Sequence, residues 1–422
     1  MRRYIFLLLF ILGFSQLMKA QDDIFIPPTI LSDSAEVSLL TSTPWDGQIY
    51  ALFGHTALRV KDPVNEFDGV FNYGVFDFSS PNFTFRFIKG ETDYMVQLDF
   101  FSDYFETYKK RGVSVIEQVI NLTQKEKQDI YTALIINAHP KNRTYRYNYF
   151  YDNCSTRPRD MIEKYIEGKI EYVPTNKEQT YRDLVHECLV FEPWVRFGID
   201  LIIGADADKI ITDRQKDFLP LYLLKAFDKA KILSGTGDSR EMVAETNVIL
   251  ESLNKEYAHA FLETVSLFYP SDYPLYSGCL LLVIAILISY FSYKAGKFGL
   301  AKLFDTLLFL LAGFGGCIIF FLMFFSEHPC VNPNWNIIWL NPLQLIIALL
   351  FFVKSLSKYL IYYHFINFVA LLLFLMAWCL IPQQLEIAFI PYILAIALRS
   401  VMNIVQQRKT KKKADYSLPK AK

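Results

Sequence analysis

The feature that most constrains this 422-residue sequence is a series of long apolar runs in its last third. A helix needs about 20 residues to cross a hydrocarbon core of about 30 Å, and four runs are long enough to do so. They lie at roughly 275–293, 303–325, 337–353 and 360–381. A fifth run at 386–405 is weaker because Pro391 and Arg399 interrupt it. We therefore predict an all-α transmembrane bundle of about five helices at 271–407, followed by a basic tail at 408–422.

Lysine and arginine residues predict the orientation of these helices. They follow the first, third and fifth apolar runs, whereas the loops after the second and fourth runs contain neither. In membrane proteins the excess of positive charge lies in the cytoplasmic loops. The odd-numbered helices should therefore end in the cytoplasm, which places the C-terminus there.

The N-terminus gives a second, independent indication of the same orientation. Two arginines precede an apolar stretch at 5–14, and Ala20 is a small residue suited to a cleavage edge, as in a signal peptide. A signal peptide at 1–20 would export the segment 21–270. We therefore predict a multi-pass protein of the bacterial inner membrane with a periplasmic domain.

The distribution of charge excludes nucleic acid as a partner. From residue 275 onward there are 13 Lys and Arg residues against 4 Asp and Glu, a net charge of +9. Because the whole chain is formally neutral, residues 1–274 carry −9. Nucleic-acid binding needs a basic patch on a folded domain. The front of the chain is instead rich in aromatic residues, and we expect it to form an α+β domain with a small antiparallel sheet. Residues 170–270 look mostly helical.

The first candidate site residue is a histidine in a predicted hairpin. Two β-rich segments, 49–60 and 70–78, flank a turn at 61–69 that contains Asp-Pro and Asp-Gly. This pattern places His55 on a strand. A single strand histidine is usually structural, so its role depends on what lies beside it.

The second candidate is Cys154, which precedes a predicted helix that ends near Gly168. At a helix N-terminus the dipole and free N–H groups lower a thiol pKa from about 8.5 toward neutral. The same N–H groups can form an oxyanion hole. A disulfide between Cys154 and Cys188 is the alternative, but polar neighbours such as Asp152 and Asn153 disfavour it.

A histidine and a helix-start cysteine together indicate thiol acyl-transfer chemistry, with Cys154 as nucleophile and His55 as its base. A third polar group should orient the imidazole. Asn72 and Asp77 on the return strand are the candidates, and we prefer Asn72. We expect no metal and no cofactor, because the six histidines show no paired ligand spacing and no Cys-x-x-Cys occurs.

The loop between the second and third apolar runs is rich in polar residues, and Asn341-Pro342 follows it inside the third run. One interpretation is an ordinary polar re-entry into the membrane with tryptophans as interface anchors. The other is a cleft for a lipid headgroup or a substrate terminus, because a broken membrane helix leaves backbone groups in need of partners. The candidate substrate-binding residues in this second interpretation are His328, Asn334, Asn336 and Asn341.

Several of these motifs resemble a known superfamily. They are Gly54-His55-Thr-Ala-Leu-Arg59, Asn72-Tyr-Gly74, Asp152-Asn-Cys-Ser-Thr-Arg157, Arg159-Asp160, Tyr181-Arg182, Trp194, Phe197-Gly-Ile-Asp200, Gly204, His328-Pro329 and Asn334-Trp-Asn336 before Asn341-Pro342. Histidine before cysteine, with Gly-His on a hairpin and Asn-Cys opening a helix, resembles the circularly permuted papain-like fold of the NlpC superfamily. Over nearly the whole mature chain, the sequence is similar to the Lnb-type lipoprotein N-acyltransferases.

The resemblance implies a reaction that uses both halves of the chain. Cys154 would take an acyl chain from a phospholipid as a thioester, and the α-amino group of a diacylglyceryl-cysteine at a lipoprotein N-terminus would then accept it. Two other thiol enzymes remain open, a membrane-tethered lipid hydrolase and a papain-like amidase or peptidase of the cell envelope. From a different class, a non-enzymatic membrane scaffold also remains open.

Overall fold

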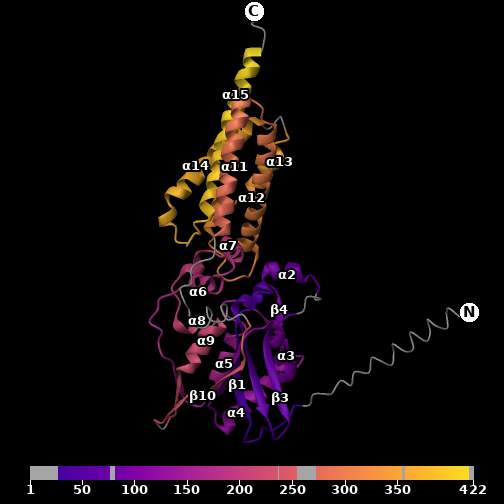
Figure 1. Ribbon diagram of the computed structural model, residues 1–422, viewed down its shortest axis with the longest axis vertical. Coiled ribbons are helices and arrows are strands. Elements are labelled where there is room, and N and C mark those ends of the chain that lie inside the picture. Colours follow the sequence, from indigo (N-terminus) through magenta and orange to yellow (C-terminus); the bar gives the residue numbers. More distant parts are fainter. Residues whose placement is uncertain (1–26, 77–80, 236, 254–271, 354–356, 418–422) are drawn as a thin grey trace, which may run out of the picture.

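The computed structural model describes residues 27–76, 81–235, 237–253, 272–353 and 357–417. The predicted signal peptide at 1–20 and the alternative orienting residue Asp77 lie outside these ranges. Within them, a mixed α/β domain is stacked end to end on a helical bundle (Figure 1).

The centre of the domain is a seven-stranded antiparallel sheet with the strand order β10-β5-β1-β2-β3-β4-β6. Its strands are β1 (Glu36–Ser42), β2 (His55–Asp62), β3 (Phe67–Val75), β4 (Asp93–Phe100), β5 (Val115–Ile120), β6 (Thr144–Arg146) and β10 (Val243–Leu250). The predicted hairpin is confirmed, because β2 pairs with β3. The segment before His55 is instead the short 3-10 helix η1 (Ile49–Phe53), which ends at Gly54 with φ of 75°.

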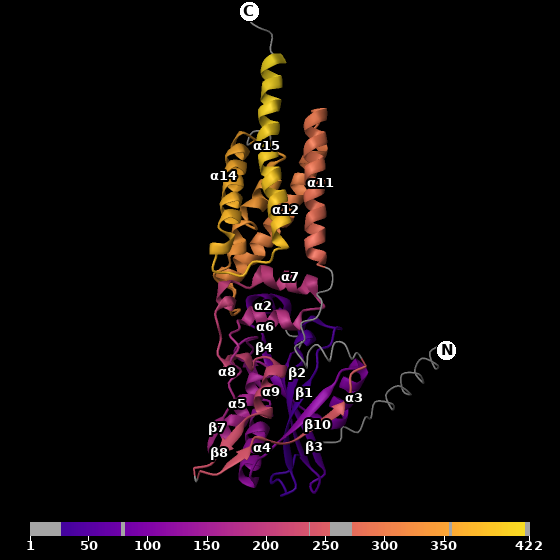
Figure 2. The same cartoon turned by 60° about the vertical axis from the view of Figure 1, so that its left-hand side comes forward.

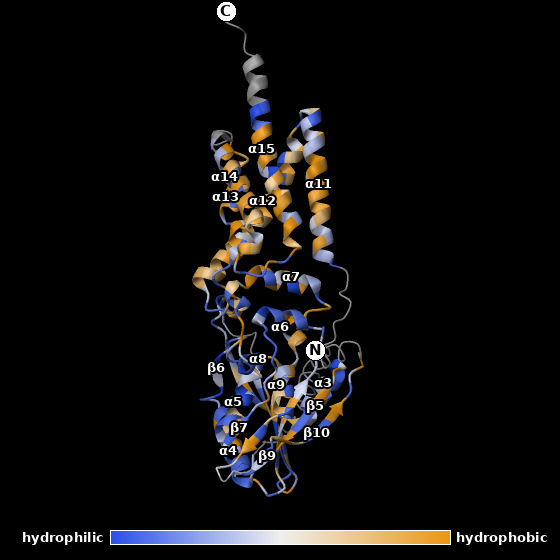
Figure 3. Cartoon of the chain, turned by 90° about the vertical axis from the view of Figure 1, so that its left-hand side faces the viewer, coloured by the Kyte–Doolittle hydropathy of each residue, from blue (hydrophilic) through white to orange (hydrophobic). Residues whose placement is uncertain are grey.

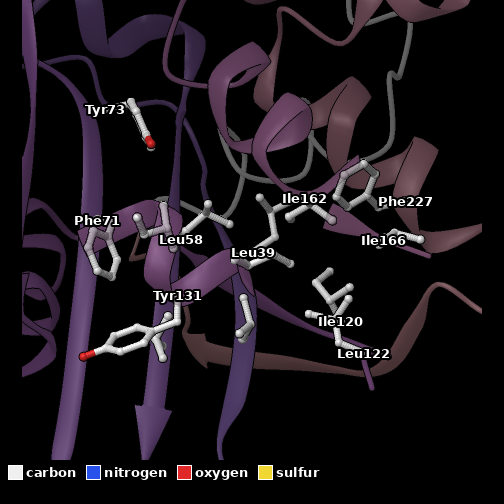
Figure 4. Packing of buried hydrophobic residues seen from close by; sticks show 14 of the residues in the cluster. Leu39, Leu58, Phe71, Tyr73, Ile120, Leu122, Tyr131, Ile162, Ile166 and Phe227 are labelled. Carbon is white, nitrogen blue, oxygen red and sulfur yellow. The ribbon is translucent and has the colours of Figure 1, made fainter. Parts of the chain in front are cut away.

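Helices cover both faces of this sheet, which explains why β1 is buried along almost its whole length. On one face Leu39, Leu58 and Phe71 pack against α4 (Gln124–Ala138) and α5 (Thr156–Tyr165), as Figure 4 shows. On the other face Leu40, Ala57 and Val70 pack against Tyr104 and Tyr108 of α3 (Phe101–Arg111). The sheet is therefore a rigid support for residues at the ends of its strands.

The segment from 170 to 250 is less helical than predicted. Its helices are α6 (Tyr181–Cys188), α7 (Pro193–Ile202), η2 (Ala205–Asp208), α8 (Asp213–Lys216) and α9 (Pro220–Asp228). Strands β7 (Lys169–Glu171), β8 (Lys231–Leu233) and β9 (Ser239–Glu241) form a second small sheet. Strand β10 joins the main sheet beside β5. An edge strand of this kind pairs with residues more than 100 positions away, so local pattern did not reveal it.

Four helices of the bundle are long and apolar enough to cross a membrane. They are α11 (Tyr273–Ala295), α12 (Gly299–Phe325), α14 (Ser357–Met376) and α15 (Phe389–Ser417). The third predicted span is shorter: η3 (Trp335–Ile338) and α13 (Leu343–Leu350) are separated by Asn341-Pro342. Proline lacks the N–H group that would continue the helix, so the apolar run is broken there. Figure 3 shows that hydrophobic residues predominate in the helices of the bundle and that the domain below it is more polar.

Contacts at both ends show that α11 and α15 run parallel. Ser277 Oγ lies 2.6 Å from Tyr392 Oη near the domain, and Lys409 Nζ donates to Tyr293 O over 2.7 Å at the far end. Charged groups inside the bundle are neutralised, since the buried guanidinium of Arg399 donates to both carboxylate oxygens of Asp305. The chain therefore enters the bundle at the domain and leaves it at the opposite end (Figure 2).

Close packing of α12 against the broken third pass yields a stability prediction. A Cβ atom on Gly313 would lie 2.1 Å from the backbone nitrogen of Leu345, whereas a Cβ on Gly299 of the same helix would meet nothing within 4 Å. We expect Gly313→Ala to lower the free energy of unfolding by about 1–3 kcal/mol, as overpacking does. The matched variant Gly299→Ala should leave it unchanged. Thermal unfolding of the detergent-solubilised protein measures this loss of stability. Equal melting temperatures for the two variants would contradict close packing at Gly313.

Candidate active site at the membrane end of the sheet

The candidate residues lie at the end of the sheet that faces the bundle. His55 is the first residue of β2, and Asn72 and Gly74 lie near the end of β3. The segment that carries Cys154 touches the bundle, because Tyr151 Oη lies 3.4 Å from Cys330 Sγ in the loop after α12. The candidate thiol therefore lies in the part of the domain nearest the membrane helices.

Asn153 builds the turn that presents Cys154. Its side-chain oxygen accepts hydrogen bonds from the backbone N–H groups of Ser155 (2.8 Å) and Thr156 (3.0 Å), which start α5. Its amide nitrogen donates to the carbonyls of Tyr149 and Phe218, each over 2.8 Å. The side chain of Asn153, and not that of the N-cap residue Ser155, satisfies the first N–H groups of the helix. Cys154 lies just before the helix and is half-buried.

The surroundings of the thiol correct one expectation from sequence. Burial raises the pKa of the Cys154 thiol to about 11, although the backbone N–H groups of Thr56 and of Cys154 itself, with the Ser155 hydroxyl, oppose this shift. Desolvation outweighs the helix N-terminus here, because an apolar environment disfavours the charged thiolate. The expected pKa near neutral is therefore wrong, and the resting sulfur is a protonated thiol. No disulfide forms with Cys188, since both cysteines are free.

His55 is linked to a short chain of polar side chains on β3 and β4. Its Nε2 atom lies 3.3 Å from Asn72 Oδ1, and Asn72 Nδ2 donates to Asp99 Oδ2 over 2.6 Å. Gln97 Nε2 donates to the other Asp99 oxygen, also over 2.6 Å. A carboxylate only accepts hydrogen bonds, so Asp99 fixes the Asn72 amide with its oxygen toward the imidazole. His55 Nε2 must then carry the proton, which leaves Nδ1 with the lone pair.

The imidazole is neutral at ordinary pH. Burial lowers the pKa of His55 to about 4, the hydrogen bond with Asn72 opposes this, and the Arg111 cation adds to the lowering. Tyr108 stacks on the ring with centroids 6.4 Å apart. Neutral imidazole is the form that can accept a proton.

Contacts around Thr56 bring the cysteine turn to the strand that carries His55. Thr56 Oγ1 lies 3.0 Å from Ser155 Oγ, and the Thr56 backbone N–H group faces the sulfur. A Cβ on Gly74 would lie 3.5 Å from Cys154 Cβ, an ordinary van der Waals contact, so Gly74 lies beside the cysteine turn, and its positive φ of 89° favours glycine there. No direct hydrogen bond joins His55 to Cys154 among the described residues.

The polar loop residues proposed for substrate binding are engaged within the protein. Asn334 Nδ2 donates to Leu201 O and Asn336 Nδ2 to Asp200 O, over 2.8 and 2.9 Å, at the C-terminal end of α7. His328 Nε2 donates to Phe87 O over 2.8 Å. Asn341 Nδ2 makes only a long bond of 3.4 Å to Ile338 O, and its oxygen is buried without a hydrogen-bond partner. Three of the four side chains therefore join the domain to the bundle.

Sequence reasoning missed Asp99, Thr56 and Tyr108. Asp99 sits diagonally from Asn72 across β3 and β4, where Asn72 pairs with Gln97. The register of two strands is set by how they pair, so no local sequence motif predicts that Asp99 will contact Asn72.

One further cluster has the composition of a metal site. Ligand atoms of His186, Asp200 and Glu386 lie within 4.8 Å of one another. Arg182 pairs with Asp200 at 2.6 Å and Arg196 pairs with Glu386 at 3.0 Å. These two guanidinium groups already neutralise both carboxylates, so the cluster has no need of an ion.

The raised thiol pKa predicts how Cys154 should react with iodoacetamide. Only the thiolate is alkylated, and its fraction rises about tenfold per pH unit below the pKa. We expect the rate at Cys154, followed by peptide mass spectrometry, to rise steadily from pH 6 to 10 without a plateau. A plateau below pH 8 would show a preformed thiolate and would contradict the desolvated site.

Comparison with known protein families covers both parts of the chain. Residues 28–187 match the family model described as the Lnb N-terminal periplasmic domain, and residues 268–412 match the Lnb transmembrane domain. No curated protein and no solved structure matches the chain significantly. The two matched regions together span more than half of the sequence. The chain is a membrane protein with an extracytoplasmic domain, and it belongs to the Lnb family.

Proposed function

We propose that this protein is a lipoprotein N-acyltransferase of the bacterial inner membrane. The observation that carries the proposal is the placement of Cys154 and the His55–Asn72–Asp99 chain at the edge of the domain beside the membrane helices. Membership of the Lnb family supports the same reaction class. Both substrates are lipids, so a thiol at this edge lies where they are found.

In the first half of the reaction, His55 Nδ1 takes the proton of Cys154 as the sulfur attacks the ester carbonyl of a phospholipid. The carbonyl oxygen becomes an oxyanion, which backbone N–H groups near Thr56 and Cys154 are suited to stabilise. The intermediate collapses to a Cys154 thioester. The leaving alkoxide of the lysophospholipid takes the proton from His55.

In the second half, the α-amino group of the diacylglyceryl-cysteine attacks the thioester. His55 takes a proton from the nitrogen and returns it to the departing sulfur, so the thiol is restored and an amide is formed. The desolvation that raises the Cys154 pKa and lowers the His55 pKa also indicates a site poor in water. Exclusion of water favours the amine over hydrolysis of the thioester.

The proposal includes the permuted papain-like fold and the topology. A strand histidine followed in sequence by a helix-start cysteine supports that fold. The parallel α11 and α15 support a topology in which α15 ends on the side of the bundle away from the extracytoplasmic domain, and the basic residues near the end of α15 support a cytoplasmic C-terminus.

The central prediction concerns the mass of a lipoprotein from cells that lack other N-acylation. With the wild-type protein we expect the N-terminal cysteine to gain one acyl chain, measured by intact mass spectrometry. With Cys154→Ala we expect no gain, because the thioester cannot form. A gain in both strains would exclude Cys154 as the nucleophile, and no gain in either would favour the hydrolase.

A second prediction tests Asp99 as a positioning residue. Asp99→Asn replaces one of the two acceptor oxygens by an N–H donor, so Asn72 and Gln97 can no longer each donate to an oxygen of this side chain and the imidazole loses its set orientation. We expect Cys154 acylation to slow roughly tenfold to a hundredfold, as misplacement of a catalytic group does, and Asp99→Glu to restore part of the rate. The matched variant Asp33→Asn, exposed and remote, should have no effect. Equal rates for the two Asn variants would remove Asp99 from the mechanism.

A further inference from the structure

The short helix α2 (Phe83–Lys89) has an unusual surface for an extracytoplasmic domain. Its sequence contains three phenylalanines and an isoleucine, yet none of its residues is buried. Phe85 is 59% exposed, Phe87 47% and Ile88 43%. Three large apolar side chains exposed on seven residues form a patch that soluble proteins usually cover.

This helix is fixed at the end of a membrane span. The backbone N–H of Glu327 donates to Lys89 O over 2.8 Å, and His328 Nε2 donates to Phe87 O over the same distance. Glu327 and His328 follow α12 directly after its last turn. Gly90 permits this approach, since a Cβ there would lie 2.9 Å from the His328 backbone nitrogen. Figures 1 and 2 show α2 at the boundary between the domain and the bundle.

The position of Phe85 beside α12 indicates which medium surrounds its ring. Its ring lies 6.4 Å from the ring of Phe321, and α12 ends at Phe325. Four residues of helix correspond to about 6 Å. Phe85 therefore lies beside the last turns of an apolar helix that is long enough to cross a membrane.

The charged residues of α2 point to the same boundary. Arg86 pairs with Asp93 at 2.6 Å, and Lys89 pairs with Glu91. Arg146 joins Asp93 to Glu327 with contacts of 3.1 Å each. An apolar helix edged by paired charges matches the division between acyl chains and headgroups.

A series of aromatic rings connects this surface to the candidate thiol. Phe87 stacks on Phe83, Phe83 on Phe76, and Phe76 packs against Tyr94, with centroids 6.0, 5.9 and 5.1 Å apart. Tyr94 stacks on Tyr147 at 4.2 Å. The Tyr147 ring would lie 3.7 Å from a Cβ on Gly74, the same position that faces Cys154 at 3.5 Å.

We propose that α2 is embedded in the phospholipid leaflet on the side of the extracytoplasmic domain, and that its aromatic rings lead an acyl chain from that leaflet to Cys154. The embedding stands on the geometry alone. The guidance of an acyl chain rests on the proposed function.

Photo-crosslinking of the full-length protein tests the embedding. We would place p-benzoylphenylalanine at position 85 in protein reconstituted in phosphatidylethanolamine–phosphatidylglycerol vesicles, and at position 136 as the matched control. Ile136 has nearly the same exposure, 58%, but lies on α4, which packs against the sheet rather than against a membrane helix. We expect a phospholipid adduct by mass spectrometry at position 85 and none at 136. A crosslink from position 85 to a second copy or another protein, or no lipid adduct, would overturn the proposal.

Two acyl donors test the guidance. With Phe85→Asp or Phe87→Asp, Cys154 acylation from vesicle phospholipid should fall at least about tenfold, whereas acylation by the water-soluble ester p-nitrophenyl acetate should match wild type. Ile136→Asp should leave both rates unchanged. Equal loss with both donors would overturn guidance of the chain. If wild-type Cys154 accepts acyl groups from neither donor, the proposed function fails, while the crosslink still decides the embedding.

Discussion

The position of the candidate site depends on the ion pairs of the buried Arg182 guanidinium, whose two partners also bond to the helical bundle. It pairs with Asp200 and Asp208 at 2.6 Å each, while Asp208 also accepts from the backbone N–H of Gln384 before α15. Asn336 adds a bond from the bundle to the Asp200 carbonyl. Removing one member of a buried ion pair leaves an uncompensated charge and costs about 3–5 kcal/mol. The bonds from Gln384 to Asp208 and from Asn336 to Asp200 cross from the bundle to the domain. They therefore fix the position of the candidate site relative to the membrane helices.

The two ionisable groups of the candidate site are both uncharged at rest. A soluble thiol enzyme commonly keeps a low-pKa cysteine at a helix N-terminus. Here Cys154 is a neutral thiol and His55 a neutral imidazole, both for the same reason, desolvation. In the proposed function, proton transfer between them would depend on a substrate that aligns the two groups and stabilises the developing charge.

Much of this arrangement could be predicted from sequence, and the exceptions share a cause. The apolar runs, the hairpin of His55 and the polar turn around Cys154 are encoded in adjacent residues, and the structure contains each of them. The predicted pKa of the Cys154 thiol was wrong because the burial of a side chain depends on the assembled fold and not on its neighbours in the sequence. Asp99 was missed because it meets Asn72 only through strand register. Asn334 and Asn336 looked free for a ligand, yet their partners are carbonyls of α7, far away in sequence.

The broken third pass has a consequence for biogenesis. Helix α13 has only eight residues, and the polar Asn341 precedes it. A segment this short does not partition into lipid alone, since about 20 apolar residues are needed to span the core. Gly313 and Gly316 instead let its backbone lie directly on α12, where any larger residue would collide with Leu345 or Asn341. The two helices therefore form a single insertion unit: α12 must still be within reach of the translocon when α13 emerges from the ribosome.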